Sequence, residues 1–224
     1  QGKGLFFQED VLQRVLDYQN GKITTTTIPD PKNPNVWGSY KDANANVDWY
    51  DVMYKDVAFS QEHNLSVSGG SDRINYYASG NYNHRDGFMN FNADFSKRYS
   101  LNAKFSAKLT DWITLSVNER FVRNEFKRPT YLNNNYFQAL ARQGWPNLPV
   151  YDPNGYMFAA PSPALNIRDG GDLNRQVDLN YHQIQLTIEP IKAFKVFSEF
   201  NYRTTNFQEN YSELITYNHN VKGE

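Results

Sequence analysis

The sequence predicts an all-β fold, a segment of an antiparallel transmembrane β-barrel with long loops that contain short helices. Three observations predict it. Long segments alternate between apolar and polar residues, the connections between them are alternately short and long, and the strands are long enough to cross a bilayer.

The clearest strand covers residues 99–109, in which odd positions are apolar or aromatic and even positions are polar. Because side chains alternate across a strand, the two kinds fall on opposite faces. Thr110-Asp111-Trp112 predicts a tight turn, and residues 113–118 alternate in the same way on the return strand. A strand of about 11 residues spans about 36 Å, and a tilt of ~45° projects this to about 25 Å, the height of the apolar band of such barrels.

Two further hairpins have the same layout. Residues 65–68 and 74–83 flank the turn residues Gly69-Gly70-Ser71-Asp72, and residues 183–188 and 194–205 flank a connection at Glu189-Pro190. The resulting division of the chain is an extracellular loop region over 1–62, strands in two hairpins over 63–123, a long extracellular loop over 124–178, a hairpin over 179–206, and the start of another extracellular loop over 207–224.

Two helices are predicted within the long loops. Near residues 8–19, Val11, Leu12, Val15 and Leu16 have helical spacing, and Asn20-Gly21 can end the helix. Residues 131–142 predict a second helix with Tyr136, Phe137, Leu140 and Ala141 on one face, stopped by Gly144.

Composition excludes several classes of function. The 224 residues carry a net charge of −1, which gives no basic footprint for nucleic acid, and the absence of cysteine excludes disulfides and thiolate metal sites. No apolar run approaches the ~18 residues of a membrane-spanning helix. The sequence starts at Gln1-Gly-Lys-Gly without a signal peptide and stops at Lys222-Gly-Glu, so we expect both ends to be cuts in a longer polypeptide.

Residues 46–122 resemble the SusC/RagA family of TonB-dependent outer-membrane transporters. The resemblance lies in Asn46-Val-Asp-Trp-Tyr-Asp, His63-Asn-Leu-Ser-Val-Ser-Gly-Gly, Tyr76-Tyr-Ala-Ser-Gly-Asn-Tyr, Asp86-Gly87, Lys97-Arg98-Tyr99 and Leu109-Thr-Asp-Trp-Ile. It implies a 22-stranded barrel with an internal plug that imports oligosaccharides or peptides across the bacterial outer membrane. It also implies a SusD-like surface lipoprotein and an inner-membrane TonB complex as partners, with no cofactor and no enzymatic activity.

The sequence departs from this pattern because it carries no plug, no TonB-contact segment and only about six strands. An open sheet edge in lipid would leave backbone groups unpaired, at several kcal/mol each. The remaining strands must therefore come from other segments of the same barrel.

Aromatic residues of the long loops are candidates for contact with substrate or a partner protein, because their faces stack on sugars or anchor proteins. The alternative is that they pack the loops against one another. These residues are Trp37, Tyr40, Trp49, Tyr50, Tyr131, Tyr136, Phe137 and Trp145.

A weak candidate for a Ca²⁺ loop is Asp42-Ala-Asn44-Ala-Asn46-Val-Asp48, which has oxygen ligands at every second position. Val47 stands where an EF-hand needs Gly, and Met53 where it needs Glu, so an ordinary polar loop is the preferred interpretation. The sequence predicts no other metal site.

The strand faces also have predicted environments. Tyr76, Tyr82, Tyr99, Trp112 and Phe121, near predicted strand ends, are expected to sit at the membrane interfaces. The polar face, which carries Asn102, Lys104, Lys108 and Arg120, is expected to face the lumen.

An alternative fold and function remain open at this stage. A soluble carbohydrate-binding β-sandwich with exposed aromatics would carry similar alternating strands, but shorter ones with more even connections. No nucleophile with a neighbouring base and no carboxylate pair supports catalysis.

Overall fold

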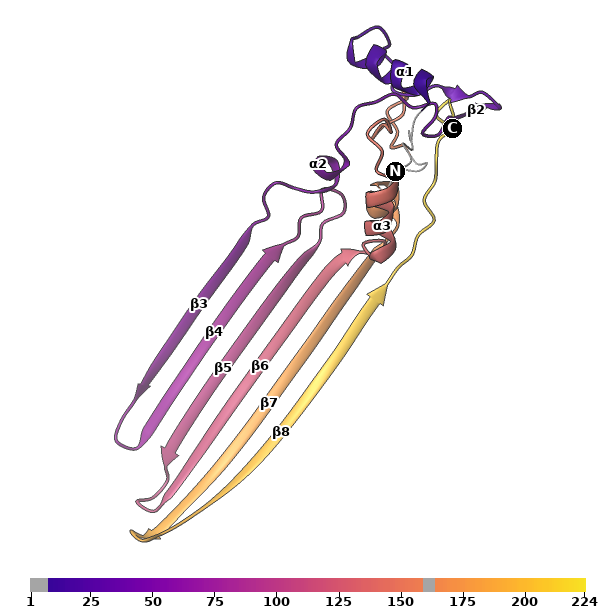
Figure 1. The fold of residues 1–224 in the computed structure, drawn as a ribbon. Helices are drawn as coiled ribbons and strands as arrows, with labels where there is room; N and C mark the ends of the chain where they lie inside the picture. Colours follow the sequence, from indigo (N-terminus) through magenta and orange to yellow (C-terminus); the bar gives the residue numbers. More distant parts are fainter. Residues whose placement is uncertain (1–7, 159–163) are drawn as a thin grey trace, which may run out of the picture.

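The computed structural model describes residues 8–158 and 164–224, so the first seven residues of the predicted leading loop and residues 159–163 of the predicted loop 124–178 lie outside it. A six-stranded antiparallel sheet carries a cluster of loops and helices at one end (Figure 1). The sheet consists of β3 (Ser60–Gly70), β4 (Ile74–Asp86), β5 (Phe95–Lys108), β6 (Ile113–Pro129), β7 (Asp172–Ile191) and β8 (Phe194–Tyr211). The other elements are α1 (Glu9–Gln19), β1 (Pro29–Asp30), β2 (Asn33–Trp37), α2 (Trp49–Met53), α3 (Asn134–Gln143) and α4 (Ala164–Asp169).

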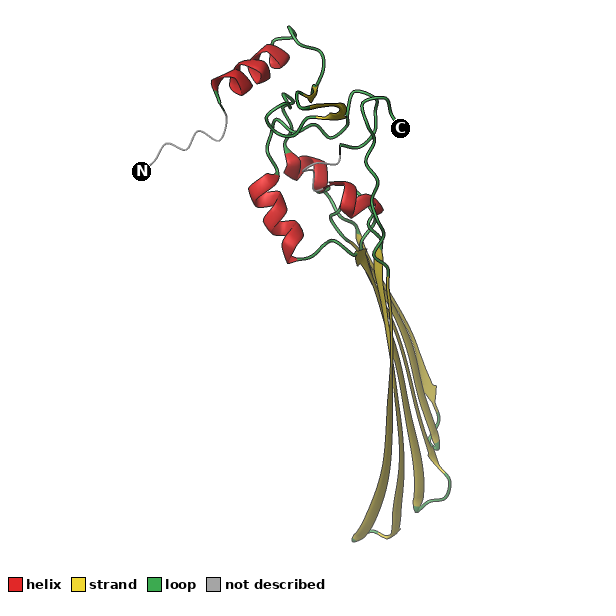
Figure 2. Cartoon of the chain, turned by 90° about the vertical axis from the view of Figure 1, so that its right-hand side faces the viewer, coloured by secondary structure: helices red, strands yellow, loops and turns green. Residues whose placement is uncertain are grey.

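The sheet is a simple meander in which each strand pairs with the next one along the chain, in the order β3-β4-β5-β6-β7-β8. Three short turns, at residues 71–73, 109–112 and 192–193, lie at one end. The long connections and helices gather at the other end, and the edge-on view in Figure 2 shows a single twisted layer. The predicted antiparallel sheet is confirmed.

Several strands run further than the alternation of the sequence indicates. β6 continues past residue 123 to Pro129 and β7 begins at Asp172, so their connection covers 130–171. In this part both faces carry charged residues, which interrupt the regular apolar alternation. The backbone ladder continues nonetheless, with Lys127 paired to Asn174.

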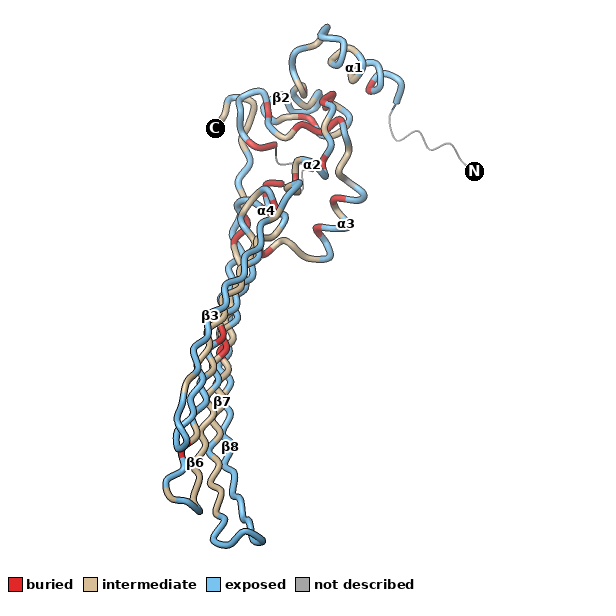
Figure 3. The backbone as a smooth tube through the Cα atoms, turned by 90° about the vertical axis from the view of Figure 1, so that its left-hand side faces the viewer, coloured by how far each residue is buried: buried red, intermediate tan, exposed pale blue. Residues whose placement is uncertain are grey.

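The hydrophobic core of the described residues lies in the loops rather than in the sheet. Side chains from the segment before β3, the β4–β5 connection and the β6–β7 connection pack together, and we call this group the loop cluster. Figure 3 shows buried segments concentrated there, whereas the strands are mainly exposed or intermediate. Its buried members are Ala43, Trp49, Met53, Met89, Tyr136, Leu140, Leu148, Met157, Phe158, Ala164, Leu165 and Ile167.

Both helices expected in the loops are present. α1 ends at Gln19 with Asn20 as its C-cap, and Gly21 takes a φ of 73°, the left-handed conformation that glycine adopts without strain. α3 begins after Asn133, whose side chain accepts hydrogen bonds from the N–H groups of Asn135 and Tyr136. The sequence placed four of its residues on one face. Tyr136 and Leu140 face the core, whereas Phe137 and Ala141 are exposed because they lie on a neighbouring face of the helix.

Candidate functional site

The register of the sheet separates its residues into two faces with different chemistry. In one cross-strand row, Val67, Ala78, Ala103, Glu119, His182 and Tyr202 lie on one face. The adjacent row, Ser66, Ser79, Asn102, Arg120, Tyr181 and Arg203, lies on the other. We call the first the apolar face and the second the polar face.

The apolar face is uncovered over the half of the sheet next to the short turns. Leu65 is 79% exposed and Phe200 63% exposed, and no second layer of the described chain packs on them. Soluble proteins rarely leave a continuous apolar surface of this kind in water, so it marks contact with lipid or with another protein.

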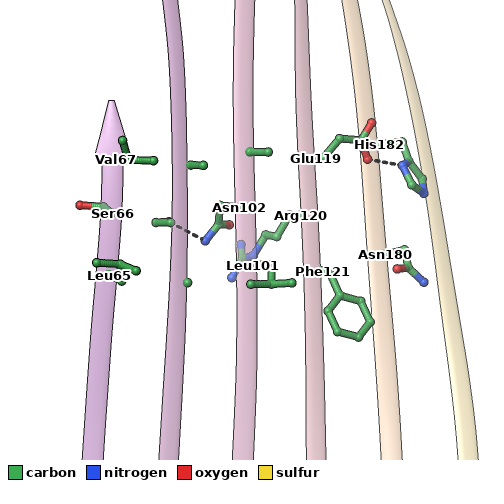
Figure 4. A pocket seen from close by; sticks show the side chains of 14 residues that line it. Leu65, Ser66, Val67, Leu101, Asn102, Glu119, Arg120, Phe121, Asn180 and His182 are labelled. Atoms are coloured by element: carbon green, nitrogen blue, oxygen red, sulfur yellow. Dashed lines mark hydrogen bonds and ion pairs between the residues drawn. The ribbon is translucent and has the colours of Figure 1, made fainter. Parts of the chain in front are cut away.

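A shallow groove of about 650 Å³ lies on this face. Small residues, Ala78, Gly80 and Ala103, leave it open between larger apolar neighbours. Figure 4 shows Leu65, Leu101 and Phe121 side by side across β3, β5 and β6 along the groove.

Aromatic side chains mark the end of the apolar half that is nearer the loop cluster, which we call its upper limit. Tyr82 and Tyr99 are directly paired, with ring centroids 5.1 Å apart. Phe121 lies two rows nearer the turns than Tyr99, and Tyr202 lies two rows nearer again. Phe121 is therefore in the middle of β6 and not near a strand end as expected, because β6 continues beyond it to Pro129.

The lower limit of the apolar half, at the end with the short turns, also shifts away from the loop cluster from one hairpin to the next. Ile74, the first residue of β4, lies in one row with Ala107 on β5 and Leu186 on β7. The turns of the second and third hairpins therefore lie progressively further from the loop cluster, since β7 continues to Ile191. Parallel steps at both limits describe an apolar belt that crosses the strands obliquely, as the tilt and stagger of a barrel require. Trp112 lies in the second turn and Tyr76 near the first, at this lower limit.

Above the aromatic limit the apolar face becomes charged. Arg123 donates to both carboxylate oxygens of Asp178 at 2.8 Å, and Gln176 donates to the same carboxylate at 3.0 Å. Just below the limit, Glu119 pairs with His182. The sequence reasoning missed both pairs, although the signal was available: Glu119 and Arg123 occupy odd positions of β6, where the alternation requires apolar residues.

The loop aromatics divide into buried and accessible groups. Trp49 and Tyr136 are 2% and 5% exposed and belong to the core, so packing of the loops is their role in this structure. Tyr50 and Phe137 are 58% and 51% exposed. The four that pack at half-buried positions against the core are Trp37, Tyr40, Tyr131 and Trp145.

Two tyrosines of the loop cluster have altered acidity. Burial raises the pKa of the Tyr136 phenol, which keeps it neutral at physiological pH. Tyr131 donates to Glu213 at 3.1 Å, and this hydrogen bond raises the pKa of Tyr131.

The four polar side chains of the candidate Ca²⁺ loop lie in different environments. Asn44 is buried and donates its amide to the Thr25 carbonyl at 2.6 Å, whereas Asn46 is exposed. Asp48 caps α2 by accepting from the N–H groups of Tyr50 and Asp51, and Asp42 is half-buried. Within residues 8–158 and 164–224 no group of three or more His, Cys, Asp or Glu side chains could hold a metal ion. No helix in those residues is both long and apolar enough to cross a membrane.

Comparison with solved structures connects this architecture to transporters. A chain of a structure described as the RagAB peptide importer in the closed-closed state superposes with a TM-score of 0.55 at 17% identity, over 75% of this chain and 20% of that chain. A chain of another, described as the RagAB peptide transporter, gives 0.59 at 18% identity, over 76% and 20%. The fold is that of a fragment of a β-barrel transporter.

The likeness is one of fold, since the identities are low and the chain spans about a fifth of the length of those chains. No protein-family model and no curated protein matches the sequence. The structural neighbours are transporters and not enzymes.

Proposed function

We propose that this chain forms part of the wall and the external loops of a TonB-dependent outer-membrane importer of oligosaccharides or peptides. The oblique apolar belt is the observation that carries the proposal. From Leu109 to Tyr99 it extends about 33 Å along the strand, which a ~45° tilt projects to about 23 Å, close to the ~25 Å of a barrel's lipid-facing band. Lipid then covers the apolar face, and the polar face lines the lumen.

The strand lengths fit the same orientation. β7 has 20 residues, about 66 Å, which exceeds what the bilayer requires. Its excess lies on the side of the loop cluster, where both faces carry ion pairs, so these strands project beyond the membrane on the external side. Short turns then lie on the periplasmic side, as in other bacterial barrels.

The proposed partners follow from the incomplete closure of the sheet and from its exposed loops. β3 and β8 each have one unpaired edge within the described sheet, and other strands of the same barrel would pair with them. A SusD-like lipoprotein would dock on the external loops, where Tyr50 and Phe137 are accessible anchors. The TonB complex would act through parts of the protein outside this chain.

Peptides are the favoured cargo, because both solved structures compared above are described as RagAB peptide importers or transporters. The alternative of a soluble carbohydrate-binding sandwich has less support. A sandwich would cover the apolar face with a second sheet, and the described residues place none there.

A spin-labelling experiment on the intact transporter tests the orientation of the two faces. A nitroxide at Ala78→Cys should be relaxed mainly by oxygen, which concentrates in lipid, and one at the neighbouring Ser79→Cys mainly by a water-soluble nickel reagent. Equal access of the nickel reagent to both labels would reject the lipid assignment. Uptake of labelled peptides and labelled oligosaccharides by cells expressing the transporter then identifies the cargo.

A further inference from the structure

We propose that four cations of the polar face, Arg98, Lys104, Arg120 and Arg203, form a binding site for the carboxylates of acidic peptide cargo. This inference rests on the proposed function, in which the polar face lines the lumen of a peptide importer. We call these four residues the cationic patch.

The cationic patch lines one open groove of about 660 Å³ across β5, β6, β7 and β8. Arg120 and Arg203 both pair with Tyr181, on either side of it, so their backbones are about 10 Å apart. Lys104 is paired with Asn118, two residues from Arg120, which makes Lys104 and Arg120 diagonal neighbours at about 7–8 Å. Val122, 6% exposed, lies in the floor of the groove.

These four cations have no carboxylate partner in the part of the chain that the structure describes, and all four side chains are exposed. Other cations of the sheet do have partners, since Arg175 pairs with Glu209 and Lys127 with Asp172. Like charges on neighbouring strands repel. An arrangement of this kind is stabilised when an anion binds between the cations.

Two carboxylates of the polar face, Glu62 and Glu199, are engaged by asparagine amides. Glu62 accepts hydrogen bonds from the side-chain amides of Asn64, Asn81 and Asn83. Glu199 accepts one from Asn201. The anion that completes the patch must therefore come from outside the described sheet.

The position of the patch favours incoming cargo over an internal segment of the protein. Arg98 precedes Tyr99, Arg120 precedes Phe121, and Arg203 follows Tyr202, so these three cations adjoin aromatic residues of the external limit of the belt. The fourth, Lys104, lies five residues nearer to the short turn than Tyr99. The patch thus extends from the level of the external membrane interface into the lumen. Cargo that enters between the loops reaches the patch before it reaches the part of the lumen next to the short turns.

The remaining side chains of the groove fit a peptide. Asn102, Asn118 and Asn124 line it, and their amides can donate to and accept from peptide groups. Arginine offers a planar fork of donors that matches a carboxylate, and such charge-assisted hydrogen bonds are stronger than neutral ones. Aspartate and glutamate side chains would bind the cations while the asparagines bind the main chain.

The test measures peptide binding to the intact transporter by calorimetry at low and high salt. The probes are a synthetic aspartate-rich peptide and its counterpart with asparagine at every aspartate. The wild type should bind the acidic peptide more tightly, with an affinity that falls as salt rises. Arg120→Gln and Arg203→Gln should each lower the affinity for the acidic peptide about tenfold and leave the affinity for its neutral counterpart unchanged.

Two further variants complete the test. Lys97→Gln removes a cation from the other face of β5 and should change neither affinity. Arg120→Glu should shift the preference towards a lysine-rich peptide, a gain that a damaged fold would not produce.

Each other outcome overturns the inference. If Arg120→Gln weakens the binding of both peptides equally, the patch holds an internal acidic segment and not the cargo. The same conclusion follows if this substitution lowers the thermal stability of the assembled transporter instead. If the wild type binds both peptides equally, only the charge preference fails and the importer remains. If it binds neither peptide, the peptide assignment of the proposed function fails as well.

Discussion

The loop cluster and the sheet differ in how their apolar side chains are covered. In the loop cluster Trp49 is 2% exposed, and Leu148 and Ile167 are fully buried by other parts of the chain. In the sheet, whose strands are mainly exposed or intermediate in Figure 3, Leu65 and Phe200 remain mostly exposed. The loop cluster therefore supplies its own core, whereas the sheet requires an apolar surrounding that this chain does not provide.

This difference separates the sources of stability in the two regions. The sheet is held by backbone ladders that run the full length of its strands. The loop cluster is held by packing and by side-chain bonds between loops, such as the Asn90 amide that donates to the carbonyls of Asp51, Val52 and Tyr54. Substitutions in the loop cluster should thus act through cavities, and those in the sheet through the medium at each face.

The largest effect is expected from Trp49→Ala in the loop cluster. It removes a buried indole together with the hydrogen bond from its Nε1 to the Trp145 carbonyl, at 3.0 Å. The loss should be about 3–5 kcal/mol of local stability. Hydrogen exchange of the Ala45 and Val47 amides, which donate to the adjacent segment at Asn147 and Pro146, measures it in the intact protein.

Tyr50→Ala is the matched control, because Tyr50 is the next residue and is 58% exposed. We expect it to change local stability by less than about 0.5 kcal/mol. Similar exchange rates in the two variants would mean that the loop cluster does not depend on its core.

The next largest effect is expected from a charge on the apolar face of the sheet. Val67→Arg places a cation in the middle of the belt and should cost about 2–4 kcal/mol if lipid covers this face. Ser66→Arg places the same cation on the polar face one residue earlier and should cost far less. The folded fraction of each variant, from the mobility shift between heated and unheated samples, compares the two; equal losses would show that the faces are wrongly assigned.

The sequence predicts the sheet well where one face is apolar and the other polar. Residues 99–109 and 113–118 alternate cleanly, and they lie in β5, its turn and β6 as expected. Beyond Phe121 the sequence loses this signal, because Asn124 and Glu125 are both polar although they point to opposite faces. Backbone pairing with a neighbouring strand extends β6 there, and such pairing leaves no mark in a single strand.

The candidate site was less predictable. Because side chains alternate along a strand, the sequence alone places Lys104 and Arg120 on the polar face. It does not predict that Arg203 lies near Arg120, because this depends on the pairing of β7 with both neighbouring strands. Among the loop aromatics, the burial of Trp49 and the exposure of Tyr50 are set by contacts with the distant residues 145–148, which local sequence does not encode.

The smallest effect is expected at the start of α3, where the loop cluster relies on a local hydrogen bond rather than on packing. The Asn133 side chain accepts from the Asn135 N–H at 2.9 Å and from the Tyr136 N–H at 3.2 Å. Asn133→Ala leaves both groups without this acceptor and should lower the local stability of α3 by about 1 kcal/mol. Hydrogen exchange of the Phe137 amide measures this loss. Asn134→Ala, inside the helix, should be neutral or slightly stabilising because alanine favours helix. If the two variants exchange alike, tertiary contacts of Tyr136 and Leu140, and not the cap, hold α3 in place.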